Sequence, residues 1–208
     1  MLDTEYYTKI LYNKETGKER YGLIQKEAAN IYAQNNIEYC WDFAMECYSS
    51  EIYYIQALGV YILGLIGNQK AIDYLKNIVS KNPAWQVQEF LAMAVDNYCE
   101  QNGYEKSLTT IHEWMDDQNA NVRRAVIEGL RIWTKRPYFK DNPELTIKLL
   151  SRLKTDESEY VRKSIGNALK DISKEFPELV KKELDSWKLD TKEVKQVYKL
   201  ASKFLEWW

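Results

Sequence analysis

The feature that most constrains the fold is a helical pattern that returns at regular intervals along the chain. Each copy opens with an apolar residue, and further apolar residues follow three or four positions apart, so they share one face of a helix. A polar or Pro-containing stretch precedes each copy, as is typical before a helix begins. The opening residues are Tyr54, Val87, Val122 and Val161, which are separated by 33, 35 and 39 residues.

Shorter amphipathic segments lie between these copies, at residues 68–79, 105–115 and 144–153. The repeating unit is therefore a pair of helices of roughly 35 to 45 residues, and such a pair buries its apolar face only against its neighbours. Eight Gly and four Pro among 208 residues also favour long helices over a turn-rich β-fold. We predict an all-α fold, a HEAT-like repeat α-solenoid of antiparallel helix pairs, curved with a concave face.

The domain organisation follows from the length and the lack of a clear linker. A chain of 208 residues suits one domain. Residues 134–143 are the most loop-like interval, and we expect them to form a long connection inside the stack. Residues 1–208 are thus predicted to form a single HEAT-like-repeat domain.

Several classes of function find no support in the sequence. The only His is His112, which leaves little material for a Ser-His-Asp or Cys-His device. Cys40, Cys47 and Cys99 form no CxxC motif and are typical of buried thiols in a reducing cytoplasm. No GxxxxGK[ST] or GxGxxG motif occurs, and the most apolar stretch, residues 52–66, is too short to span a membrane. We expect a cytoplasmic protein with no metal, no cofactor and no membrane partner.

The net charge of −2 conceals an uneven distribution. Residues 1–119 carry 9 Lys and Arg against 17 Asp and Glu, whereas residues 120–208 carry 20 against 14. Such asymmetry can place an anionic partner against one part of a protein. The alternative is an ordinary solvated basic surface.

A HEAT-like stack lines its concave side with the second helix of each pair. The positions two residues after each opening apolar residue are Gln56, Glu89, Arg124 and Lys163. Basic side chains on successive helices would match the spaced phosphates of a duplex. The remaining basic candidates on these helices are Arg123, Arg131, Arg162 and Lys170.

Glu89 is the exception in that row, because a carboxylate repels phosphate. Trp85 stands four residues earlier, so the two side chains share one helix face. An indole attracts positive charge, and a carboxylate stabilises a developing oxocarbenium ion. The pair could therefore hold a cationic sugar or base. The alternative is a Trp partly packed in the core beside an exposed Glu.

Three segments, residues 85–89, 121–131 and 158–174, resemble the DNA alkylation repair family, the HEAT-like-repeat DNA glycosylases of the AlkD and AlkC type. The resemblance covers roughly residues 22–187. It implies excision of positively charged N3- and N7-alkylated purines from duplex DNA, with Trp85 and Glu89 at the deoxyribose of the lesion. It also implies phosphate contacts by Arg124 and Lys170. Its AlkC side suggests Asp171 as a second carboxylate, whereas pairing with Lys170 or Lys174 is the alternative.

The sequence departs from that family pattern in three places. Glu89 stands where AlkD-type members have an Asp, which is one methylene shorter. Asn167 stands where AlkD-type members have a second active-site Trp, and the match starts only near Gly22, so we expect a shortened set of leading helices. The family also contains shortened members that bind DNA without glycosylase activity.

We therefore predict a DNA-binding HEAT-like-repeat protein of this family, which is a candidate base-excision N-glycosylase for N3- and N7-alkylated purines. A non-catalytic protein that binds duplex or branched DNA is the alternative, with a protein-interaction scaffold third, so enzyme activity is left open. The expected partner is alkylated or distorted duplex DNA, bound by a monomer. The predicted DNA-binding residues are Arg123, Arg124, Arg131, Arg162, Lys163, Asn167 and Lys170.

Overall fold

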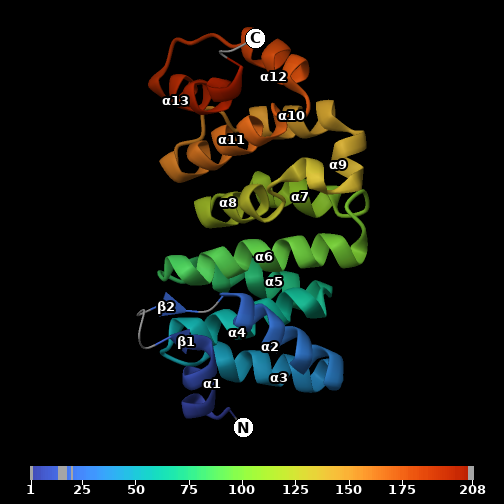
Figure 1. The fold of residues 1–208 in the computed structure, drawn as a ribbon, viewed down its shortest axis with the longest axis vertical. Coiled ribbons are helices and arrows are strands. Elements are labelled where there is room, and N and C mark those ends of the chain that lie inside the picture. The colour runs from blue at the N-terminus through green and yellow to red at the C-terminus, as the bar shows by residue number, and fades with distance from the viewer. Residues whose placement is uncertain (1, 14–17, 20, 206–208) are drawn as a thin grey trace. The chain divides into compact units, whose positions relative to one another are not determined.

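The computed structural model describes residues 2–13, 18–19 and 21–205. The chain divides into two compact units, Met1–Ser107 and Leu108–Trp208, and each is a stack of helices (Figure 1). The all-α prediction is confirmed for the described residues, in which strands are limited to one antiparallel pair of two residues each. The single domain over residues 1–208 and its concave face remain predictions.

Unit 1 is organised around one apolar helix, α4, which packs against α2, α3 and α6. Ten of its fourteen residues are buried, which explains why this segment is the most apolar part of the sequence. The elements of unit 1 are α1 (Thr4–Leu11), β1 (Tyr12–Asn13), β2 (Lys18–Glu19), α2 (Tyr21–Gln34), α3 (Ile37–Tyr48), α4 (Tyr53–Ile66), α5 (Gln69–Asn77), the 3-10 helix η1 (Val79–Lys81) and α6 (Trp85–Asn102).

Helices α4 and α6 lie so close together that only a glycine fits at their contact. A Cβ atom added to Gly64 would lie 2.5 Å from the Cα of Ala94. Real Cβ atoms do not approach so closely, so the missing side chain sets the spacing of the two helices. This spacing brings the core of one repeat directly against the next.

Unit 2 repeats this plan around α11, which packs against α8 and α13 (Figure 1). Helix α7 packs against α8, and α10 packs against α11 and α12. The elements of unit 2 are α7 (Leu108–Met115), α8 (Ala120–Gly129), η2 (Trp133–Lys135), α9 (Pro137–Asp141), α10 (Pro143–Ser151), α11 (Glu159–Ile172), α12 (Pro177–Asp185), α13 (Lys192–Ala201) and η3 (Ser202–Phe204).

The connection predicted at residues 134–143 is helical rather than a loop. It contains most of η2 and the short helix α9, which begins at Pro137. Trp133 and Phe139 are fully buried, with ring centroids 4.8 Å apart. The indole N–H of Trp133 donates to the Ile127 carbonyl at 3.2 Å. Aromatic packing therefore holds this segment against the unit.

Candidate nucleic-acid interface

Four of the long helices begin with the same contact between a side chain and the preceding turn. A Gln or Arg side chain donates to the carbonyl oxygen six residues earlier, at 2.6 to 2.8 Å. The residue that supplies this carbonyl also accepts, through its side chain, the backbone N–H two residues further on. These contacts fix the orientation of the start of each helix relative to the turn that precedes it. We call the four sets the turn pairs: Ser50–Gln56, Asn82–Gln88, Asp117–Arg123 and Asp156–Arg162.

The turn pairs correct the repeat register expected from the sequence. That register aligns Gln56 with Glu89, but Gln56 makes the contact that Gln88 makes in the next repeat. The counterpart of Val87 is therefore Ile55, which is fully buried, and the first interval is 32 residues. The reason for the error is that Tyr54 and Ile55 are both apolar and both buried, so periodicity alone does not distinguish them.

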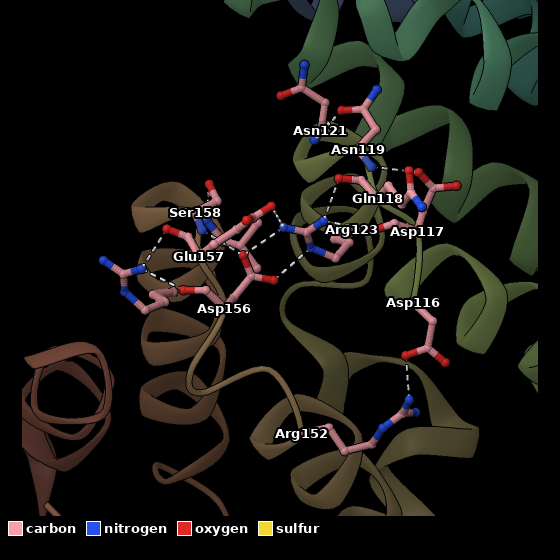
Figure 2. A network of polar contacts seen from close by, with 12 residues as sticks. Asp116, Asp117, Gln118, Asn119, Asn121, Arg123, Arg152, Asp156, Glu157 and Ser158 are labelled. Carbon is pink, nitrogen blue, oxygen red and sulfur yellow. Dashed lines mark hydrogen bonds and ion pairs between the residues drawn. The ribbon is translucent and has the colours of Figure 1, made fainter. Parts of the chain in front are cut away.

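Arg123, a predicted phosphate contact, is buried and bound to other groups of the protein. Its Nε and Nη2 donate to the two carboxylate oxygens of Asp156 at 2.7 and 2.8 Å, and its Nη1 donates to the carbonyls of Asp117 and Gln118 (Figure 2). The hydrogen bond to Asp156 raises the pKa of Arg123 above its ordinary value. The side chain is buried, and all three guanidinium nitrogens are occupied. Arg123 thus joins α8 to the turn before α11.

Arg162 repeats this arrangement one repeat later. Its Nη1 donates to the carbonyls of Asp156 and Glu157 at 2.6 and 2.9 Å. Its Nε donates to the Oε1 of Gln196 on α13 at 2.8 Å. The side chain of Arg162, also a predicted phosphate contact, is buried as well. Arg123 and Arg162 each link one repeat of unit 2 to the next.

Arg131 and Asp171 form an ion pair between α11 and the chain that follows α8. The Nε of Arg131 donates to Asp171 at 2.9 Å, and its Nη1 donates to Glu128 at 3.2 Å. Lys174 donates to the other oxygen of Asp171 at 3.1 Å. Burial by itself raises the pKa of Asp171, but hydrogen bonds from Arg131 and Lys174 hold that pKa below its ordinary value. The ion-pair alternative for Asp171 is therefore the one observed, with Lys174 as a partner rather than Lys170.

The solvent-facing side of α11 and of the turn that follows it carries three lysines and one asparagine, which we call the α11 stripe: Lys163, Asn167, Lys170 and Lys174. Lys163, Asn167 and Lys170 are three or four residues apart and share one face of α11, and Lys174 lies two residues after the end of the helix. Lys163 and Lys174 are exposed, whereas Asn167 and Lys170 are half-buried. Lys163 pairs with Glu159 at 2.7 Å, and Lys170 donates to Asn167 at 2.9 Å. Lys174 is an additional candidate DNA contact, and its place four residues after Lys170 is visible in the sequence.

Arg124 lies on the neighbouring helix α8 and is half-buried. It directly follows Arg123, and one step along a helix turns the side chain by about 100°. The two arginines therefore point in different directions, and Arg123 points into the turn. Arg124 stays a predicted phosphate contact.

Trp85 and Glu89 occupy the first turns of α6 in unit 1. Trp85 is the first residue of the helix and is 62% exposed, so most of its ring is open to solvent. Glu89 is half-buried on the same face. The turn before them is fixed, because Gln88 donates to the carbonyls of Val79 and Asn82 at 3.0 and 2.8 Å. An indole and a carboxylate thus stand together at a defined helix start.

Thiols and clusters of metal-binding side chains are two further kinds of functional group that the described residues could provide. Cys40, Cys47 and Cys99 are buried free thiols, and burial raises the pKa of Cys47 well above its usual range. In residues 2–13, 18–19 and 21–205, no group of three His, Cys, Asp or Glu side chains could hold a metal ion. Over the same residues, every helix is too short or too polar to cross a membrane.

Comparison with known proteins places this geometry among DNA repair proteins. The family model described as DNA alkylation repair enzyme matches residues 14–202. The crystal structure of AlkD2 from Streptococcus mutans is 45% identical, with a TM-score of 0.90 over 96% of this chain and 97% of that chain. The fold class predicted from the sequence is confirmed by this match.

Two further relatives are more distant or match only in part. The Pseudomonas fluorescens alkylpurine DNA glycosylase AlkC, bound to DNA containing an abasic site analog, is 21% identical, with a TM-score of 0.68 over 88% of this chain and 52% of that chain. The uncharacterized protein YhaZ of Bacillus subtilis is 41% identical over 87 residues, which are 40% of this chain. That match spans 24% of YhaZ, so the chain covers about a quarter of this relative.

Proposed function

The chain belongs to the DNA alkylation repair enzyme family, and from this premise we propose that it binds duplex DNA and removes cationic alkylated purines from it. DNA binding is assigned to the α11 stripe together with Arg124. Base removal is assigned to Trp85 and Glu89. The observation that carries the second assignment is the exposed indole of Trp85 on the same helix face as a carboxylate.

Charge supports the DNA-binding part of the proposal. Lys163 and Lys170 lie on one face of α11, and Lys174 follows in the turn after it. Each phosphate contact by a lysine releases condensed counterions from DNA. This contribution needs no base recognition and makes the affinity depend on salt. The DNA-bound AlkC, which shares the fold, is consistent with a DNA partner. The binding is expected in the cytoplasm and by a monomer.

The chemistry of Trp85 and Glu89 suits the removal of a cationic base. An N3- or N7-alkylated purine is positively charged and leaves with the electrons of its bond to C1′, so it needs no proton from an acid. The sugar then becomes an oxocarbenium ion, which water attacks at C1′. The Glu89 carboxylate would stabilise this cation, and the face of the Trp85 ring would attract the same positive charge.

A base-release assay tests this assignment. Methylated duplex DNA is incubated with the protein, and free 7-methylguanine and 3-methyladenine are measured by chromatography. Wild type should release base, and Glu89→Gln should be slower by about 10² or more, as for loss of one charge-stabilising group. Glu100→Gln, at an exposed position of the same helix, is the matched control and should keep full activity. No release by excess wild-type protein would rule out the excision part alone.

A non-catalytic DNA-binding role is the second candidate. It is favoured by Asn167, which occupies the position of an active-site Trp in the resembling enzymes and is hydrogen-bonded to Lys170. This alternative expects normal affinity for duplex DNA, measured by fluorescence anisotropy, together with no base release. The two assays therefore separate the candidates.

A further inference from the structure

Tyr160 is the most exposed large apolar side chain among the described residues, at 72%, and Trp85 follows at 62%. Both rings stand in the first turn of a long repeat helix. The proposed base-removal site includes Trp85, whereas it leaves Tyr160 without a role. Exposed single aromatic residues are common, so Tyr160 needs further evidence before a role is assigned.

The turn just before Tyr160 is held by several hydrogen bonds. Arg162 donates to the carbonyls of Asp156 and Glu157, and the Asp156 carboxylate accepts the N–H of Ser158 at 2.8 Å. Arg123 binds the same carboxylate from the neighbouring repeat (Figure 2). A ring on a turn fixed in this way loses little backbone freedom when a ligand binds.

Charge next to the ring indicates the kind of ligand. The Nζ of Lys163 lies 5.7 Å from the centroid of the Tyr160 ring. Lys163 also pairs with Glu159, but both side chains are solvated, so water and salt weaken that pair and the ammonium can bind a phosphate instead. Lys170 and Lys174 continue the positive charge along the α11 stripe. An aromatic ring beside a row of cations is the combination that binds single-stranded nucleic acid, with bases on the ring and phosphates on the lysines.

Resting on the proposed DNA binding, we propose that Tyr160 stacks on an unpaired nucleobase of the bound DNA while Lys163 binds a neighbouring phosphate. Bases inside an intact duplex are stacked on both faces and offer no surface to the ring. A bulged, gapped or branched site does offer one. The surface formed by Tyr160 and the α11 stripe therefore prefers DNA with an unstacked base over fully paired DNA.

The experiment compares two labelled duplexes that differ only in one bulged adenine, with affinities measured by fluorescence anisotropy on the full chain. Tyr160→Ala should reduce the affinity for the bulged duplex about fivefold or more, the lower end for removal of one base–aromatic stack. Its affinity for the paired duplex should barely change. Tyr160→Phe keeps the ring and should behave as wild type.

A second readout reports the stacking itself. With 2-aminopurine as the bulged base, wild type and Tyr160→Phe should quench its fluorescence on binding, whereas Tyr160→Ala should not. Tyr39→Ala removes another exposed tyrosine, on α3, and should leave both affinities unchanged. The melting temperature of Tyr160→Ala, measured by circular dichroism, should match that of wild type, because the exposed ring contributes little to the core.

The outcomes separate this inference from the proposed function. If wild type binds both duplexes and Tyr160→Ala binds the bulged one equally well, Tyr160 has no stacking role while DNA binding stands. If wild type binds neither duplex at low salt, the proposed DNA binding fails and this inference fails with it. A fall in affinity for both duplexes in Tyr160→Ala would show a general contact and would also contradict the preference.

Discussion

Arg123 and Lys163 show how differently basic residues of corresponding helices are used. Substituting Arg123 by Met would leave the buried Asp156 carboxylate without its ion-pair partner. We expect the free energy of unfolding to fall by about 3 to 5 kcal/mol, as when one partner of a buried pair is removed. Urea unfolding followed by circular dichroism measures this change. Lys163→Met is the control and should unfold almost as wild type, because its ion pair with Glu159 is exposed; equal behaviour of the two variants would contradict the structural role of Arg123.

Asp171 should make stability depend on pH at the acid end. Its pKa in the folded protein is lowered, so the folded state binds the proton less readily than the unfolded chain. Its contribution is therefore complete above the unfolded pKa of about 3.9 and is lost as the pH falls through the folded value. The difference in unfolding free energy between wild type and Asp171→Asn should be largest at neutral pH and shrink below about pH 4. If the difference in unfolding free energy between the two proteins grew as the pH falls, the pKa of Asp171 in the folded protein could not be lowered.

The sequence shows which residues are basic, but it does not predict which of the basic side chains point into the protein. Arg123 and Arg124 are adjacent and chemically alike, yet Arg123 is buried and donates to two backbone carbonyls, whereas Arg124 is half-buried. Every residue has a backbone carbonyl, so the residue type does not show which carbonyl accepts a hydrogen bond. In the sequence, the turn pairs are visible only as two polar residues six positions apart. Trp85, by contrast, is exposed as its functional interpretation requires.

The contact between α4 and α6 leads to a prediction at the scale of elements. Gly64→Ala would place a methyl group against the backbone of Ala94, so the helices must move apart. We expect the free energy of unfolding in urea to fall by about 1 to 3 kcal/mol, which is typical of overpacking. Gly22→Ala is the matched control, since a Cβ there meets no atom within 4 Å inside a helix. That variant should be neutral or more stable by up to about 1 kcal/mol; similar destabilisation in both variants would argue against close packing at Gly64.

Helical periodicity predicts the long helices correctly because their buried faces are wide and continuous. It fails where two signals coincide. Residues 134–143 combine Pro, Asn and Asp, which are typical both of loops and of helix starts, and the structure uses Pro137 to begin α9. The first repeat is displaced by one residue because Tyr54 and Ile55 are both apolar.

At the scale of the whole molecule, the distribution of charge is more informative than the net charge of −2. The excess of Lys and Arg after residue 119 includes buried arginines that join repeats, so only part of it is available to a partner. The lysines of the α11 stripe belong to the part that is not buried, as do Lys181, Lys182 and Lys188. Sequence counts alone do not separate these two uses of positive charge, because both raise the same total.

Whether the α11 stripe holds DNA is measured by the salt dependence of the affinity for a fully paired duplex. The wild type is compared with a variant in which Lys163, Lys170 and Lys174 are replaced by Gln. The control variant replaces the exposed Lys181, Lys182 and Lys188 by Gln and changes the net charge equally.

We predict that wild type binds at low salt and that its log–log salt slope falls in magnitude by about two to three in the α11 variant, roughly 0.9 for each phosphate that a lysine no longer neutralises. The control variant should keep the wild-type slope. Absence of binding by wild type at low salt, or an unchanged slope in the α11 variant, would contradict the claim that this helix holds DNA.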